Sequence, residues 1–133
     1  MKFHKDGSRP MSGTTVFVFG SNLAGRHGSG AARAARENYG AEYGKGVGRT
    51  NQAYAIPTLN GDLKKLSLSA ISVHVSNFLA YTLLHPELEF FVTRIGCVLA
   101  GYSNSEIAPM FKAFPDNCSF AEEWKPFLEE VKV

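Results

Sequence analysis

The sequence predicts one α/β domain with helices on both faces of a mixed, largely parallel sheet. Short runs of β-branched and aromatic residues, which are typical of buried strands, alternate with segments in which apolar residues recur at helical spacing. The chain has 133 residues, the usual size of a single domain, and no linker-like tract or repeat divides it. Alternating strands and helices favour a largely parallel sheet covered on both sides.

The N-terminal half predicts a leader, a strand, a loop and a helix. Residues 1–13 are polar and rich in turn formers, so we expect a flexible leader, with the domain itself spanning 14–133. Thr14–Phe19 (TTVFVF) reads as a buried strand that Gly20 ends. After a glycine-rich loop, residues 31–38 (AARAAREN) have high helix propensity.

The C-terminal half repeats the alternation. We expect a strand over 53–58 (AYAIPT), a helix over Ser69–Leu84 and a strand over Glu89–Ile95 (EFFVTRI). Ser103 and Glu106 have the spacing of a capping box and predict the start of another helix. A last helix is predicted from the apolar stripe formed by Trp124, Phe127, Leu128 and Val131.

Composition excludes several classes of protein. The formal net charge is only +2 and the basic residues are scattered, so the composition argues against a nucleic-acid partner. Cys97 and Cys118 lie in no ligand spacing, so we expect neither a metal site nor a disulfide scaffold, and no motif indicates a cofactor. No apolar stretch is long enough to span a membrane, which favours a cytoplasmic protein, and a homo-oligomer is left open.

The first candidate site is the glycine-rich stretch GSNLAGRHGSG between the first strand and the first helix. Glycines allow the backbone to approach a phosphate closely, and a helix N-terminus supplies unpaired N–H groups. The stretch matches neither GxGxxG nor a P-loop, so the alternative is that its glycines merely permit a tight turn. The predicted ligand-binding residues here are Gly20, Ser21, Asn22, Gly28, Ser29 and Gly30.

The second candidate site is the stretch GCVLAGY, which follows the predicted strand over Glu89–Ile95. Loops at the carboxyl ends of parallel strands meet at one edge of the sheet, where ligands of α/β proteins bind. The alternative is that the apolar side chains here fill the core, although a ligand would use their N–H groups. Thr93 and Arg94 either line the same cleft or lie within the sheet. The predicted ligand-binding residues of this loop are Gly96, Cys97, Val98, Leu99, Ala100, Gly101 and Tyr102.

Three segments in order, VFVFGSNLAGRHGSGAARAA, AYAIPT and VTRIGCVLAGYSNSEIAPMF, resemble the macro-domain-like superfamily, and in particular its short, uncharacterised bacterial and phage members. The resemblance implies a three-layer α/β/α sandwich that binds ADP-ribose. The two loops would then hold the diphosphate and the distal ribose, and Asn22 would hydrogen-bond that ribose.

The sequence departs from the family pattern in both loops. Arg26, His27 and Ser29 interrupt the glycine run, and Ala100 lies where some deacylating members have an acidic residue. Neither loop has a carboxylate, so a hydrolase would need His27, a remote acid or a substrate-assisted water for proton transfer. The candidate catalytic residues, if the protein is an enzyme, are Asn22 and His27. We therefore expect a protein that binds ADP-ribose or a related nucleotide. The alternatives are an ADP-ribosyl hydrolase and an assembly protein with a degenerate pocket.

Overall fold

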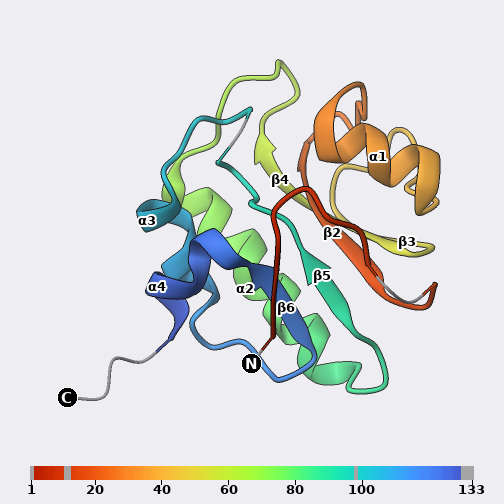
Figure 1. Ribbon diagram of the computed structural model, residues 1–133. Helices are drawn as coiled ribbons and strands as arrows, with labels where there is room; N and C mark the ends of the chain where they lie inside the picture. Colours follow the sequence, from red (N-terminus) through yellow and green to blue (C-terminus); the bar gives the residue numbers. More distant parts are fainter. Residues whose placement is uncertain (1, 11–12, 98, 130–133) are drawn as a thin grey trace.

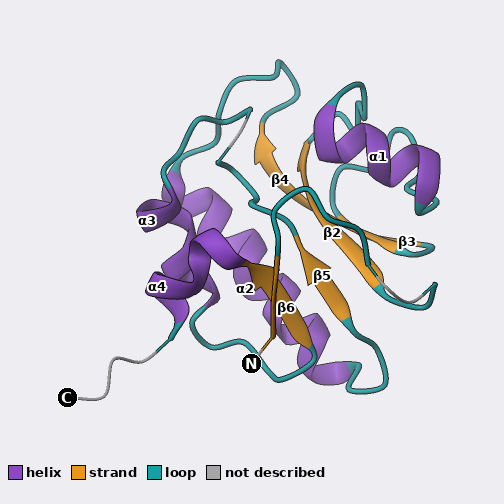
Figure 2. Ribbon diagram, in the orientation of Figure 1, coloured by secondary structure: helices purple, strands orange, loops and turns teal. Residues whose placement is uncertain are grey.

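The computed structural model describes residues 2–10, 13–97 and 99–129, and its centre is a six-stranded sheet in the order β1-β6-β5-β2-β4-β3 (Figure 2). Every pair of neighbouring strands is parallel except β3–β4, so the predicted mixed, largely parallel sheet is confirmed. The strands are Lys2–His4 (β1), Val16–Asn22 (β2), Gly48–Thr50 (β3), Ala53–Leu59 (β4), Phe90–Val92 (β5) and Cys118–Ala121 (β6).

Helices cover both faces of the sheet, which gives three layers. Figure 1 shows α1 on one face and the other helices on the opposite face. Among the described residues no helix is long and apolar enough to cross a membrane. The helices are Gly30–Asn38 (α1), Leu68–Leu84 (α2), Asn104–Ile107 (α3) and Lys125–Leu128 (α4), with 3-10 turns at Ala108–Phe111 (η1) and Glu122–Trp124 (η2).

The alternation of side chains along β2 creates the two cores. Val16 and Val18 belong to the larger core, which contains α2 and the 3-10 turns, whereas Phe17 and Phe19 belong to the smaller core beneath α1. On α1 the buried residues are alanines, Ala32 among them, and such small side chains let a helix lie close to a sheet. The smaller core therefore depends mainly on the aromatic residues of the strands.

The prediction of a flexible leader over residues 1–13 is wrong for Lys2–His4. Lys2–His4 form β1 and pair with β6, where Phe3 lies opposite Phe120. Parallel pairing at the sheet edge satisfies backbone groups that a free leader would leave to water. The sheet therefore begins well before residue 14.

The C-terminal elements are shorter than predicted. The capping box at Ser103 is present, but α3 ends at Ile107 and continues as the 3-10 turn that contains Pro109. Proline has no N–H for an α-helical bond, so a long helix cannot run through it. Of the apolar stripe predicted for the last helix, Trp124 and Leu128 are buried as expected, but Trp124 lies in η2 and Leu128 in α4. Val131 lies outside the described residues.

Candidate functional site

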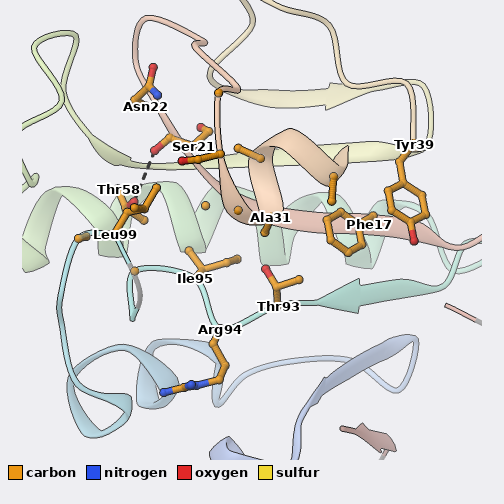
Figure 3. A pocket seen from close by; sticks show the side chains of 18 of the residues that line it. Phe17, Ser21, Asn22, Ala31, Tyr39, Thr58, Thr93, Arg94, Ile95 and Leu99 are labelled. Carbon is orange, nitrogen blue, oxygen red and sulfur yellow. Dashed lines mark hydrogen bonds between the residues drawn. The ribbon is translucent and has the colours of Figure 1, made fainter. Parts of the chain in front are cut away.

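A cavity of about 820 Å³ lies where the carboxyl ends of β2, β4 and β5 meet, and it continues along α1 (Figure 3). Its walls include Ser21 from β2, Thr58 from β4, Ile95 from the segment after β5 and Ala31 from α1. The N-terminal segment closes one side with residues such as Asp6. The volume is in the range of pockets that hold drug-sized and cofactor-sized ligands.

The structure brings most of the predicted site residues to this cavity. His27, Cys97, Gly101 and Tyr102 are not part of its wall, and Val98 lies outside the described residues. The predicted residues that do line it are Gly20, Ser21, Asn22, Gly28, Ser29, Gly30, Gly96, Leu99 and Ala100.

The glycines of the first loop have two different roles. Gly25 has φ +69°, and a Cβ atom there would overlap the backbone of Gly44. A Cβ atom at Gly46 would overlap the carbonyl oxygen of Asn22. These two glycines therefore allow the first loop to lie against the segment before β3. At Gly28, in contrast, an added Cβ has nothing within 4 Å, so packing does not require a glycine there.

The N-terminus of α1 presents unpaired donors to the cavity. Ser29 occupies the N-cap position, but its side chain makes no capping hydrogen bond, and the first turn contains no acidic residue. The first backbone N–H groups of a helix have no acceptor within the helix, and the dipole makes that end positive. Because Ser29, Gly30 and Ala31 line the cavity, these groups are suited to an anion.

Asn22 is engaged in the structure of its own loop. Its Nδ2 donates to the carbonyl oxygen of Arg26 at 2.8 Å, and its Oδ1 accepts from the Arg26 backbone N–H at 3.0 Å. Figure 3 shows its amide directed away from Ile95 and Thr93. The side chain closes the turn after β2, and this role accounts for an asparagine at that position.

His27 is fully buried beneath the first loop. Its ring packs edge to face on Phe19, with 5.3 Å between the ring centroids, and neither ring nitrogen has a hydrogen-bond partner among the described residues. Burial lowers the pKa of His27, so the ring is neutral near pH 7. A side chain in this position does not reach a ligand in the cavity.

The second loop approaches the first through its backbone. Gly96 has φ +78°, and a Cβ atom there would lie 3.1 Å from Cδ1 of Ile107. A Cβ on Gly20 would lie 3.6 Å from the backbone nitrogen of Gly96, so the two strand ends are close neighbours. Glycine at position 96 thus permits both the left-handed backbone and the contact with α3.

Two side chains predicted for this loop serve other contacts. The Tyr102 hydroxyl donates to the carbonyl oxygen of Leu66 at 2.5 Å, and the amino group of Lys65 lies 4.7 Å from the centre of its ring. Tyr102 therefore ties its loop to the segment before α2. Cys97 is half-buried, and burial raises the pKa of its thiol, which disfavours the reactive thiolate.

Charged residues also border the cavity. Arg9, Arg26 and Arg94 line it, and Asp6 is the one carboxylate on its wall within the described part of the chain. His4 lines it too, with its ring stacked on Phe91 at 3.7 Å between centroids. The cavity is therefore electropositive at neutral pH.

Arg94 is held by a partly buried network of hydrogen bonds. Its Nε and Nη2 donate to Oδ1 of Asn104 at 3.0 and 2.9 Å, and the same oxygen accepts from Nε1 of Trp124 at 3.0 Å. Its Nη1 lies 3.3 Å from Oδ2 of Asp6. The sequence left open whether Arg94 lines the cleft or lies within the sheet, and the structure places it on the cavity wall.

Two solved structures of Bacteroides thetaiotaomicron proteins share this fold. A structural genomics target superimposes with a TM-score of 0.63 at 17% sequence identity, covering 91% of this chain and 99% of that one. A protein described as of unknown function gives a TM-score of 0.62 at 17% identity, covering 90% and 96%. No protein-family model and no curated protein sequence matches the chain. The chain is thus similar in its whole architecture to these two bacterial proteins.

Proposed function

We propose that this protein binds ADP-ribose, or a closely related phosphate-bearing nucleotide, in the cavity between the two glycine-containing loops. The observation that carries the proposal is the open N-terminus of α1, which borders an electropositive cavity of about 820 Å³. The resemblance to macro-domain-like proteins supports the same ligand, because the loops that carry the resemblance are the ones that border the cavity.

The diphosphate fits the side of the cavity formed by the first loop. Gly28 and Gly30 have no neighbour within 4 Å of an added Cβ, so their backbone is open to a ligand. The N–H groups at the start of α1 would donate to phosphate oxygens, and Arg26 would add a charge near them. The backbone of Gly96 lies across from this loop and would bound the ligand from the other side.

Binding without turnover accounts for the geometry better than hydrolysis does. The Asn22 amide is engaged by Arg26, and His27 is buried outside the cavity wall. The two residues expected to serve an ADP-ribosyl hydrolase are thus both committed to the loop itself. Hydrolysis and a purely structural role remain the alternatives that experiments should separate from binding.

Isothermal titration calorimetry tests the proposal, with ADP-ribose as ligand and AMP and NAD as comparators. We expect micromolar or tighter binding of ADP-ribose, and loss of that binding in Gly28→Glu, which places a carboxylate beside the helix N-terminus. Gly61→Glu is the matched control, because Gly61 also has no neighbour within 4 Å of an added Cβ but is not part of the cavity wall. Absence of heat with all three ligands contradicts the proposal, and release of ADP-ribose from a modified protein would favour the hydrolase.

A further inference from the structure

The side of α2 that faces solvent carries no charged residue. Among the 17 residues Leu68–Leu84 there is no aspartate, glutamate, lysine or arginine, and the histidine, His74, is half-buried. A helix on the surface of a domain normally has charged and polar residues on the side that faces water. The exposed residues of α2, which we call its outer face, are Ser69, Val73, Ser76, Asn77, Ala80, Leu83 and Leu84.

Three large apolar side chains stand out from this outer face. Val73 is 60% exposed, Leu83 is 65% exposed and Leu84 is 76% exposed. Arg49 of β3 donates to the hydroxyl oxygen of Tyr81 at 3.0 Å, so this charge lies at the edge of the face. Contiguous apolar surface of this kind, bordered by polar groups, is typical of sites that contact another protein.

The outer face is complementary to itself when two copies of α2 lie antiparallel. If the helices are aligned at their midpoints, Val73 of one copy lies opposite Ala80 of the other. The same register places Leu84 opposite Ser69. Each of these large apolar side chains then opposes a small residue, which lets the two helices approach closely.

The charges that flank α2 favour the same orientation. Lys64 and Lys65 precede the helix, Glu87 and Glu89 follow it, and all four are exposed. Glu89 also pairs with Lys2, but both side chains of that pair are more than half exposed to solvent. In an antiparallel pair the basic end of one helix meets the acidic end of the other, and the helix dipoles are also opposed. A parallel pair would instead bring like charges together.

We propose that two copies of this chain form a symmetric dimer through the outer faces of α2, with the two-fold axis between Ser76 and Asn77. In such a contact the same surface is used by both copies, so association stops at two. The dimer is independent of the proposed function, because no residue of α2 lines the cavity. Since α2 and α1 lie on opposite faces of the sheet (Figure 1), both cavities stay open to solvent.

The size of the contact sets the expected strength of the dimer. A helix of this length extends about 25 Å and is about 10 Å wide, whereas a standard stable interface buries about 800 Å² on each partner. We therefore expect a reversible dimer with a Kd on the order of 1–100 μM. Sedimentation-velocity ultracentrifugation over a range of concentrations measures this Kd. A chain that stays monomeric at millimolar concentration overturns the proposal.

Charge substitutions at two opposing positions test the face and its register. Val73→Glu and Ala80→Lys each place two like charges in an uncharged contact, so each variant alone should associate at least about tenfold more weakly than the wild type. A mixture of the two variants should dimerise again, because the opposite charges then face each other. Leu23→Glu is the matched control, since Leu23 is 46% exposed but follows β2 in the first loop, and this variant should dimerise like the wild type.

Disulfide formation tests the antiparallel orientation. Ser76→Cys places a thiol beside the two-fold axis, so two copies should become cross-linked under mild oxidation. Ser69→Cys is the control on the same face, because in the antiparallel pair Ser69 lies about 22 Å from its counterpart along the helix. A disulfide requires Cα atoms within about 7 Å, so this variant should remain uncross-linked like the wild type.

Circular dichroism confirms that each variant is folded, which the exposure of all the substituted positions leads us to expect. Unchanged association of both Val73→Glu and Ala80→Lys would show that the dimer uses another surface, and would overturn the proposal. Failure of their mixture to dimerise, or cross-linking of Ser69→Cys as readily as Ser76→Cys, would overturn the antiparallel arrangement and the proposal with it.

Discussion

Gly46 allows the segment before β3 to lie against the first loop, and its replacement by alanine should destabilise the protein. The added methyl group would overlap the carbonyl oxygen of Asn22 and lie 3.0 Å from its carbonyl carbon and 3.2 Å from the nitrogen of Gly25. All three atoms belong to the backbone, so no side chain can rotate to make room. The carbonyl oxygen of Gly46 also accepts a hydrogen bond from the buried Ser21 hydroxyl, which movement of this segment would lengthen.

Overpacking of this kind costs about 1–3 kcal/mol, and we expect a value at the upper end because the obstacle is rigid. At roughly 4 °C per kcal/mol for a chain of this size, the melting temperature of Gly46→Ala should fall by about 8–12 °C. Thermal unfolding followed by circular dichroism measures this shift. The expected loss concerns folding stability, because Gly46 is not part of the cavity wall.

Gly28→Ala is the control for this experiment. Gly28 has nothing within 4 Å of an added Cβ and, like Gly46, has no left-handed φ, so the substitution should change the stability by no more than about 0.5 kcal/mol. Equal melting temperatures for Gly46→Ala and the wild type would refute the close approach of the two segments. A large fall in the melting temperature of Gly28→Ala would refute the conclusion that packing does not require a glycine at this position.

Three further predictions concern the titration of a histidine, the closure of a turn and the capping of a helix. Burial lowers the pKa of His4 to about 4 from 6.5, so its contribution to stability is complete above about pH 6.5 and is lost as the pH falls toward 4. In urea titrations, the free energy of unfolding of His4→Phe should therefore fall by about 1–3 kcal/mol less between pH 6.5 and pH 4 than that of the wild type. The same pH dependence in the variant and the wild type would contradict this. Asn22→Ala removes both hydrogen bonds to the Arg26 backbone and should cost about 1–3 kcal/mol, whereas a wild-type melting temperature would mean that the turn holds without them. Ser67→Ala removes the hydroxyl that caps α2 and should cost about 1 kcal/mol, with ligand affinity unchanged, so a change in affinity alone would contradict its structural role.

The strands and helices with a clear pattern of apolar residues were predictable from the sequence. The buried runs that became β2 and β4 are rich in β-branched, aromatic and alanine residues, and the apolar spacing of α2 identified a helix within one residue of its observed bounds. The strands β1 and β3 have three residues each and contain basic and polar side chains. Their extended form depends on the neighbouring strand, and such pairing leaves no periodic signal in so short a segment.

The position of the candidate site was predictable from the sequence, but only some of the residues that line it were. The two loops meet because the strands before them are parallel neighbours, which follows from the alternation of strands and helices. The sequence did not distinguish Gly28, which is open to the cavity, from Gly25, which packing requires. It also gave no sign that Asp6 would lie beside Arg94, because that contact joins residues 88 positions apart through the sheet order.

The most direct test of the central claim is an amide chemical-shift titration of the isotope-labelled protein with ADP-ribose. We predict that the largest changes occur at the amides of Gly28, Ser29, Gly30 and Gly96, which border the cavity, while the exposed residue Val73 on α2 does not respond. Saturable changes confined to those loops would place the nucleotide between them. An unchanged spectrum at millimolar ADP-ribose, or changes centred on the α2 face, would contradict the account.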